Sequence, residues 1–298
     1  MKYSSIKTQL RFAYLSLLPI FLLFTVLRIW PILQAFYLSL TNYQLAKRRF
    51  SFLGLQNFIN LFTKDKDFIL SLKNTLLFAF LTAVFLLLLS FIVALIMDRR
   101  RIFGIGLLQS MYFLPVVISV VPCAIIWKWI YDPQYGILNQ ILKVFGLKGI
   151  GWLVDSRFSI YSVIVFVVWK WLGYYMVIFW VGLKAIPDQY IEAARIDGAG
   201  QLKIVRLIIL PLLRPIILLA TVFTTVRGFT LFSEVYVMTV GSQGAPGNMV
   251  KVLTYDIYER SFVFFKVGEA NAEAIILFLL LLGFSIAQIA INRRGRQV

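Results

Sequence analysis

Residues 74–97 read NTLLFAFLTAVFLLLLSFIVALIM, a stretch of 24 residues without a charged side chain. An α-helix needs about 20 mostly apolar residues to cross the hydrocarbon core of a bilayer, so this stretch predicts a membrane-spanning helix. Five further stretches are similarly long and apolar, and three of them contain isolated charges. The six predicted spans are 12–40, 74–97, 102–127, 158–183, 215–240 and 274–292. The sequence therefore predicts an all-α integral membrane protein with six transmembrane helices.

The composition supports a membrane protein and excludes most enzyme classes. Hydrophobic residues make up 60% of the 298 residues and charged residues 14%, against about 25% charged residues in soluble domains. The net charge of +17 would suggest nucleic acid for a soluble protein, but in a membrane protein it indicates orientation. With no histidine and with Cys123 as the single cysteine, the usual general base, Cys-based metal sites and nucleophile pairs are missing. We expect no catalytic residue, no metal site and no nucleic-acid partner.

The distribution of Lys and Arg predicts the orientation of the spans. These residues are denser in the N-terminal segment, the second and fourth connections and the C-terminal tail than in the other connections. The denser segments are 1–11, 98–101, 184–214 and 293–298. By the positive-inside rule, both termini and the 184–214 loop are cytoplasmic, although Lys47, Arg48 and Arg49 on the outer side oppose this orientation.

The first predicted span has an alternative interpretation as a signal peptide. Lys2, Lys7 and Arg11 precede an apolar run, which is the arrangement of a signal sequence. The run continues past Trp30 and Pro31 without a good small-x-small cleavage site. We therefore expect an uncleaved first helix.

The loop 184–214, KAIPDQYIEAARIDGAGQLKIVRLIILPLLR, does not have the composition of an ordinary connection. Pro187 and Asp188 predict a helix start, because proline suits the first turn and a carboxylate can accept from free amides there. Gly198 predicts the end of this helix, since glycine adopts the left-handed conformation that terminates helices. A second helix is predicted to begin near Gly200.

Two interpretations of this loop are open from its spacing alone. Its helices are basic and partly apolar, so they can lie on the headgroups of anionic lipid. The short helix also presents Tyr190, Glu192, Ala193 and Ala194, and small alanines allow another helix or groove to approach closely. The second interpretation is a docking helix for a partner protein.

The same residues resemble a known motif. Glu192-Ala193-Ala194, followed by Gly198 and then by Ile208-Ile209-Leu210-Pro211, is similar at every anchor position to the EAA motif. That motif marks the integral-membrane subunits of binding-protein-dependent ATP-binding-cassette (ABC) importers. The chain thus resembles an ABC importer permease.

A wider resemblance covers nearly the whole chain and concerns the carbohydrate-uptake permeases of the maltose and glycerol-3-phosphate type, particularly the MalF-like half of the permease pair. The matching stretches are 52–58 (FLGLQNF), 73–75 (KNT), 113–115 (FLP), 127–131 (WKWIY), 136–139 (GILN) and 232–239 (FSEVYVMT). The sequence departs from the family at Ser233, at 241–247 (GSQGAPG), and at Glu269 and Glu273, on the outer side and near the substrate path.

The resemblance implies a type I importer permease bundle, with 1–298 as a single transmembrane permease domain and 184–214 as its cytoplasmic coupling loop. The implied ATPase-coupling residues are Tyr190, Glu192, Ala193, Ala194, Arg195, Asp197 and Gly198. No Gly-Lys precedes Ser or Thr, so there is no Walker A motif and no cofactor is expected on this chain. ATP and Mg would bind to a partner ATPase.

The resemblance also implies the partners and the location of the chain. The partners would be a second homologous permease subunit in a heterodimer, two cytosolic ABC ATPase subunits, an extracytoplasmic substrate-binding protein and membrane lipid. The chain would be a multi-pass protein of the bacterial cytoplasmic (inner) membrane. It would move a sugar, in particular an oligosaccharide, by alternating access.

Charged residues inside the spans need an explanation, because each costs about 2.5–3.5 kcal/mol at the centre of an inserted helix. One interpretation is a polar substrate path, because aromatic faces suit sugar rings. The predicted path residues are Lys170, Tyr174, Tyr175, Arg227, Phe232 and Glu234. The other interpretation is packing between helices or snorkelling of the basic side chains, with Trp127, Trp129 and Trp152 as interfacial anchors. In a continuous fifth helix, Arg227 and Glu234 lie two turns apart, too far for a direct contact.

Two other function classes compete with the importer. A self-contained secondary transporter or channel is disfavoured, because carboxylates in the spans are scarce, histidine is absent and no inverted repeat is evident. An intramembrane enzyme is disfavoured, because a lone carboxylate such as Glu234 has no visible catalytic partner. The sequence leaves open whether the sugar is neutral or anionic.

Overall fold

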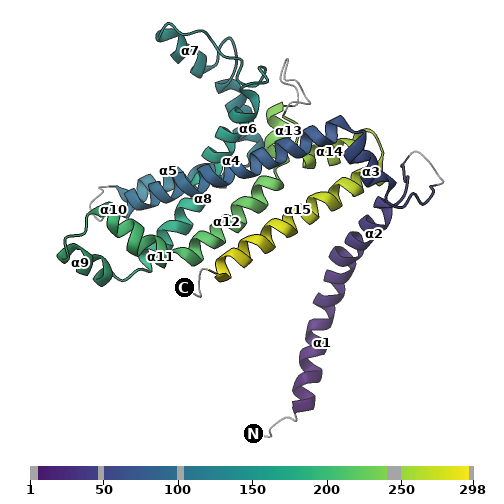
Figure 1. Cartoon of the computed structure of the whole chain (residues 1–298), viewed down its shortest axis with the longest axis horizontal. Coiled ribbons are helices and arrows are strands. Elements are labelled where there is room, and N and C mark those ends of the chain that lie inside the picture. Colours follow the sequence, from purple (N-terminus) through teal and green to yellow (C-terminus); the bar gives the residue numbers. More distant parts are fainter. Residues whose placement is uncertain (1–5, 46–49, 99–103, 240–249, 295–298) are drawn as a thin grey trace. The chain divides into compact units, whose positions relative to one another are not determined.

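A computed structural model of the chain describes residues 6–45, 50–98, 104–239 and 250–294 (Figure 1). Helices dominate this described part, which contains no β-strand beyond an isolated bridge between Thr41 and Phe52. The chain divides into two compact units. Unit 1 consists of Met1–Asp65 and Ile257–Ile276, and unit 2 of Lys66–Asp256 and Leu277–Val298. The single-domain organisation stays a prediction.

Some residues used in the sequence interpretation lie outside the described part. They include Lys2 and the outer-side basic residues Lys47, Arg48 and Arg49. The basic residues of 99–101, the departing stretch 241–247 and Arg296 also lie outside it.

Unit 1 begins with the first predicted span, which is helical throughout its described length. It comprises α1 (Ile6–Phe24), the π-helical segment η1 (Thr25–Ile29) and α2 (Trp30–Ser39). Pro31 has no amide hydrogen to donate to the carbonyl of Leu27. The π-turn lies just before this proline, where the Trp30 amide donates to the Thr25 carbonyl, five residues earlier. Most side chains of this span are exposed in the isolated chain.

The segments of unit 1 that follow the first span are held by polar contacts. In α3 (Gln56–Thr63), the Asn57 amide donates to the carbonyls of Ser39 at 2.7 Å and Thr41 at 2.8 Å. These bonds fasten α3 to the end of the first span, and Asn57 lies within the stretch that resembles the sugar permeases.

The π-segment η3 (Glu259–Val263) carries a buried arginine that binds three carboxylates. Arg260 contacts Asp65 at 2.7 Å, Glu269 at 3.0 Å and Glu273 at 2.7 Å. The last two belong to the start of α15 (Val267–Arg294). The departures at Glu269 and Glu273 thus supply the counter-charges that a buried guanidinium requires.

Unit 2 is built around α4 (Lys66–Met97), α8 (Ser159–Lys184) and α12 (Arg214–Phe229). The buried stripe of α4 is rich in small and hydroxyl side chains, whereas large apolar side chains such as Leu88 and Ile96 are exposed. Buried hydroxyls, including those of Thr82 and Ser90, donate to carbonyls four residues earlier. Small residues at helix contacts with large apolar residues outside are typical of helices surrounded by lipid.

The third predicted span is broken. It consists of α5 (Ile105–Val117) and α6 (Val120–Ile130), which are bent by 102° relative to each other. Pro122 cannot donate to the carbonyl of Ile118, and its ring would clash with that carbonyl in a continuous helix. Ile118 and Ser119 are therefore extended. Pro115, in contrast, lies inside α5 without ending it.

The fifth predicted span is bent at its beginning. The helical run α10 (Gln201–Ile204), η2 (Val205–Ile209) and α11 (Leu210–Leu212) makes an angle of 74° with α12. Counting each bent pair as one span, the described residues contain up to six spans, as the sequence predicts, and four of these are single long helices.

The predicted continuous helix over 215–240 is wrong. α12 ends at Phe229, and α13 (Ser233–Thr239) begins after a three-residue gap. The Thr254 hydroxyl donates to the carbonyl of Leu231 inside that gap. The length and hydropathy of the apolar stretch cannot predict such a contact.

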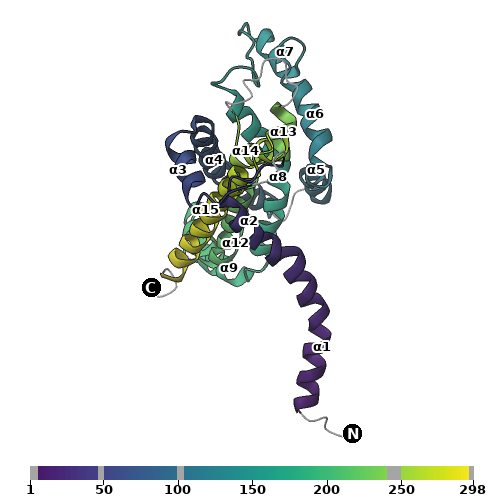
Figure 2. The same cartoon turned by 90° about the vertical axis from the view of Figure 1, so that its right-hand side faces the viewer.

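The segment 131–157 contains α7 (Ile137–Val144), which Figures 1 and 2 draw apart from α4, α8 and α12. Asn139 is buried and organises the segment. Its amide donates to the carbonyls of Pro133 and Ile150, and its oxygen accepts from the Trp152 indole at 3.0 Å. Trp152 is thus half-buried in this network, whereas Trp129 is 72% exposed.

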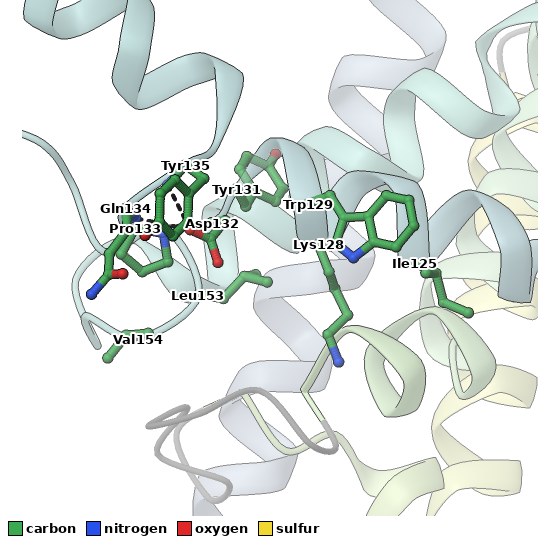
Figure 3. Close-up of a pocket in the computed structure, with 10 residues that line it drawn as sticks. All are labelled: Ile125, Lys128, Trp129, Tyr131, Asp132, Pro133, Gln134, Tyr135, Leu153 and Val154. Carbon is green, nitrogen blue, oxygen red and sulfur yellow. Dashed lines mark hydrogen bonds between the residues drawn. The ribbon is translucent and has the colours of Figure 1, made fainter.

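A pocket of about 470 Å³ lies beside this segment (Figure 3). Its lining includes Lys128, Trp129, Asp132 and Tyr135. The Asp132 carboxylate accepts from the amides of Gln134 and Tyr135, so it is occupied in shaping the turn.

The connection before α14 (Leu253–Tyr258) is fixed to the N-terminal part of α4. The Asn74 amide donates to the carbonyl of Lys251 at 2.9 Å, and the Thr75 hydroxyl accepts from the amide of Leu253. Lys251 and Asp256 form a buried ion pair at 2.7 Å. These contacts give the 73–75 stretch a structural role.

Candidate functional site

Two regions of unit 2 contain the residues singled out from the sequence. The first is the midspan cluster, which we define as Lys170, Trp171, Arg227 and Glu234. The second is the loop 184–214, which we call the coupling loop after its predicted role.

The unbroken helix α8 positions Lys170 in its interior. Lys170 is the twelfth of 26 residues in this helix, and it is only 1% exposed. Its ammonium donates to the carbonyls of Pro115 at 2.5 Å, Val116 at 3.4 Å and Ile118 at 2.6 Å. These carbonyls lie at the end of α5, where the break leaves them without helical amides. Lys170 therefore does not snorkel; it binds the end of a broken helix.

The neighbouring Trp171 lies against the fifth span. The Arg227 guanidinium carbon is 3.3 Å from the centre of the Trp171 ring, a close cation–π contact. The Trp171 indole also donates to a Glu234 carboxylate oxygen at 3.2 Å. One indole therefore contacts both the end of α12 and the start of α13.

The predicted separation of Arg227 from Glu234 is wrong. An Arg227 guanidinium nitrogen is 4.0 Å from a Glu234 carboxylate oxygen. The two residues approach each other because the helix stops at Phe229 and restarts at Ser233, which shortens the path between them. Glu234 is 6% exposed, whereas the Arg227 side chain is 31% exposed.

Aromatic rings surround the cluster. Tyr174 makes edge contacts with Trp171, at 6.5 Å between ring centres, and with the buried Tyr175, at 5.2 Å. Phe232, in the gap between α12 and α13, stacks on Tyr236 at 5.3 Å. Five of the six predicted path residues are thus linked around Trp171: Lys170, Tyr174, Tyr175, Arg227 and Glu234. Phe232 instead packs on Tyr236 and Tyr255, and contact of these residues with a substrate stays a prediction.

The charges of the cluster define its chemistry. The Lys170 charge is buried among carbonyl oxygens, and Glu234 offsets that of Arg227. The part-exposed Arg227 and the half-buried Tyr174 and Phe232 offer hydrogen-bond donors and ring faces. In the described residues no group of three or more His, Cys, Asp or Glu side chains is placed so that it could hold a metal ion. The arrangement suits reversible binding of a polar ligand.

The coupling loop folds as its sequence predicts. The first helix, α9, runs from Asp188 to Ile196, with Pro187 at the N-cap. Gly198 has a φ of +76°, which side-chain-bearing residues rarely adopt, and the Ala199 amide donates to the carbonyl of Ala194 to close the helix end. The second helical run begins after Gly200. The predicted start, stop and restart are confirmed.

The helix α9 is exposed in the isolated chain and contains no buried residue. Ala194 is half-buried, and the other predicted coupling residues are exposed. The exposed residues are Tyr190, Glu192, Ala193, Arg195, Asp197 and Gly198. A pocket of about 480 Å³ beside α9 is lined by Asp98, Ile191 and Glu192, among others. An amphipathic helix so placed can present its exposed face to another surface.

Sequence reasoning missed the partners that hold the midspan cluster. The partners of Lys170 are the backbone carbonyls of Pro115, Val116 and Ile118, which side-chain types cannot indicate. One signal was present: Pro122 has no amide hydrogen to donate to the carbonyl of Ile118. Tyr236 and Tyr255 were also not singled out, and their rings are 5.5 Å apart beside Phe232.

Known proteins resemble the chain over nearly its full length. It is 32% identical over 289 residues to a relative from Bacillus subtilis (strain 168) named a probable ABC transporter permease protein, YurN, covering 95% of this chain and 97% of that protein. It is 28% identical over 288 residues to the trehalose/maltose transport system permease protein MalF of Thermococcus litoralis, covering 97% and 96% of the two chains.

A solved structure shows the same fold. A chain of a bacterial alginate ABC transporter, in complex with an alginate-bound periplasmic protein, superimposes with a TM-score of 0.82 over 96% of both chains, at 22% identity. The all-α membrane bundle is thus that of a type I importer permease. Residues 103–297 match the family model of binding-protein-dependent transport system inner membrane components. The chain belongs to this family of multi-pass importer permease subunits.

Proposed function

We propose that this chain is one of two homologous permease subunits of an ATP-driven importer, and that it moves a sugar, in particular an oligosaccharide, by alternating access. The exposed α9 carries this proposal, because a helix with an EAA sequence and no buried residue offers a free face to a cytosolic partner. Relatives named for trehalose/maltose, lactose and arabinooligosaccharides support a sugar as the substrate.

The partners follow from this role. Two cytosolic ABC ATPase subunits would supply ATP hydrolysis and hold ATP and Mg, since this chain has no Walker A sequence and acts as a translocation subunit. A second, homologous permease would complete a heterodimer, and a substrate-binding protein would deliver the sugar from outside. Lipid or the second permease would cover the exposed first span.

The orientation and the residue roles are part of the same proposal. Both termini and the coupling loop would be cytoplasmic, which the dense Lys and Arg of these segments support. Glu192 would be the polar contact with the ATPase, and Ala193 and Ala194 its close-packing surface. Tyr190, Arg195, Asp197 and Gly198 would complete this contact, with Gly198 as the turn behind it.

The substrate path would lie at the midspan cluster and its aromatic surroundings. Arg227, Tyr174 and Phe232 would face the sugar with hydrogen-bond donors and ring faces, which suit hydroxyl-bearing rings. Lys170, Tyr175 and Glu234, which are buried, would support them from behind.

The charge-reversal variant Glu192→Lys tests the coupling role. We expect uptake and copurification of the ATPase to fall by about tenfold, equivalent to about 1.4 kcal/mol, because a like-charge or mismatched contact weakens association. The protein should remain in the membrane. The matched control is Gln140→Lys, an exposed change on α7 outside the coupling loop, which should leave both measurements unchanged.

Purification from the natural host tests the proposal as a whole. An ATPase and a second permease should copurify with the chain. Isolation of a stable and active lone subunit, or normal uptake by the Glu192→Lys variant, would contradict it. Binding measurements on the cognate binding protein would name the sugar.

A further inference from the structure

Adjacent residues on one unbroken helix hold the ends of two broken spans. On α8, Lys170 binds the break at Ile118–Ser119, and Trp171 binds across the break at residues 230–232. Broken helices in a bilayer need polar partners for their free backbone groups, and they often occur where a transporter moves or binds.

The contact at the third span replaces lost helical hydrogen bonds. In an unbroken helix the carbonyls of Pro115, Val116 and Ile118 would accept from amides four residues later, but the break and Pro122 remove those donors. The Lys170 ammonium supplies donors to all three at 2.5–3.4 Å. A lysine so buried is costly unless its donors are used, and here they are used entirely on backbone.

The contact at the fifth span spans the gap itself. Arg227 lies in the last turn of α12, and Glu234 in the first turn of α13. Trp171 lies against both, with the guanidinium 3.3 Å from the ring centre and the carboxylate accepting from the indole. The angle between α12 and α13 is therefore coupled to the position of one side chain on α8.

We propose that Lys170 and Trp171 are positioning residues that fix the helix ends at both breaks. We further propose that the transport cycle widens the substrate path by changing the contacts of these two residues. This inference rests on the proposed function. α8 ends at Lys184, directly before the coupling helix, and Lys170 lies about 21 Å from that end at 1.5 Å per residue. A shift of the coupling loop thus reaches both breaks through one continuous helix.

Polar contacts of this kind suit a moving part. A hydrogen bond to a carbonyl can be exchanged for one to water or to a ligand at little net cost, whereas a packed apolar contact leaves a void when it separates. The midspan cluster holds two helix ends by exchangeable contacts inside an otherwise packed bundle. It therefore forms a two-state element that both ATP binding and substrate binding can bias.

Cys123 provides a native reporter for the third-span break. It is the only cysteine of the chain, lies four residues after Ser119 and is 2% exposed. The rate at which N-ethylmaleimide labels Cys123 in the assembled complex, identified by peptide mass, therefore measures opening of this break.

The test compares Lys170→Met with Lys170→Arg, with and without Mg-ATP and vanadate. In the unchanged chain, we expect slow labelling that differs between the two nucleotide conditions. Lys170→Met keeps the length of the side chain but removes its donors, so labelling should become about tenfold faster and lose that difference. Lys170→Arg restores donors and should return labelling toward the unchanged rate.

A second reporter tests the fifth-span contact independently. Val235→Cys, in a Cys123→Ala background, places a thiol at a fully buried position of α13. Trp171→Phe keeps a ring beneath Arg227 but removes the donor to Glu234, so it should speed labelling at residue 235 severalfold. It should leave Cys123 protected in a chain that retains Cys123.

Two results would overturn the inference. One is slow, nucleotide-dependent labelling of Cys123 in an intact Lys170→Met complex. The other is unchanged labelling at residue 235 in the Trp171→Phe variant. This second result would overturn the inference even if the Lys170→Met complex does not assemble. If either result is obtained with a complex that retains its ATPases, the proposed importer function is not contradicted. Absence of copurifying ATPases from the unchanged chain would contradict that proposed function instead.

Discussion

The third and fourth spans are both strongly apolar, yet one is broken and the other is not. α8 runs continuously from Ser159 to Lys184, although it contains a lysine in its interior. The third span contains no charge within its predicted bounds, 102–127, but bends by 102° between Val117 and Val120. The continuity of these helices therefore depends on backbone hydrogen bonding and not on hydropathy.

The two helices also complement each other. The buried Lys170 ammonium of α8 donates to carbonyls of the third span that have lost their helical partners. These are the carbonyls of Pro115, at 2.5 Å, and Ile118, at 2.6 Å. Neither feature is favourable alone, because a buried unpaired ammonium and a buried orphan carbonyl each lose hydration. Together they form a stable crossing of α5 and α8.

The largest effect should come from filling the crossing itself. A Cβ on Gly173 would lie 2.0 Å from the carbonyl oxygen of Tyr112, which is backbone and cannot move aside easily. Gly173→Ala should therefore destabilise the protein by roughly 1–3 kcal/mol or more. The measurement is thermal stability of the purified complex by size-exclusion chromatography after heating.

The matched control is Gly106→Ala, on α5 itself, where a Cβ would meet nothing within 4 Å. This change should be neutral or stabilise by up to about 1 kcal/mol, because alanine is the better helix former. Equal effects of the two variants would mean that the close approach of α5 and α8 does not limit stability.

An intermediate effect should come from removing the cause of the break. Pro122→Ala restores an amide for the carbonyl of Ile118 and removes the clash of the ring, so the bend should open. Spin labels at Leu107→Cys and Ile126→Cys, both exposed positions, report this change in a Cys123→Ala background. Their separation should lengthen toward about 29 Å, the length of 19 helical rises.

Pro115→Ala is the control for that change. Pro115 lies inside α5 without breaking it, so the distance between the labels should stay as in the unchanged chain. If Pro115→Ala opens the bend and Pro122→Ala does not, the assignment of the break to Pro122 is wrong.

The smallest effect should come from the ion pair at the end of the unbroken helix. Lys184 contacts Asp98 at 2.8 Å, and both side chains are substantially exposed, at 48% and 31%. Lys184→Met should cost no more than about 1 kcal/mol, because water and salt screen such pairs. Thermal stability in low and high salt, with the exposed Lys203→Met as control, measures this contribution.

The coupling loop could be predicted closely because its signals are local. Pro187, Gly198 and Gly200 restrict their own backbone, so they fix where α9 begins and ends wherever the loop lies. The midspan cluster could not be predicted in this way. The sequence identified Lys170, Arg227 and Glu234 as unusual charges inside the spans. The contact of Arg227 with Glu234, however, requires an interruption of the helix that the residues of 215–240 do not indicate.

The class of protein, the number and approximate positions of the spans, and the bounds of α9 could therefore be predicted from the sequence. These depend on hydropathy over about 20 residues and on the backbone preferences of proline and glycine, which act over a few neighbours. The binding of Lys170 to the end of α5 and the contact of Trp171 with α12 and α13 are seen only in the folded chain. The reason is physical: their partners are backbone carbonyls and side chains more than 50 residues away, and only the packing of whole helices brings them within hydrogen-bond distance.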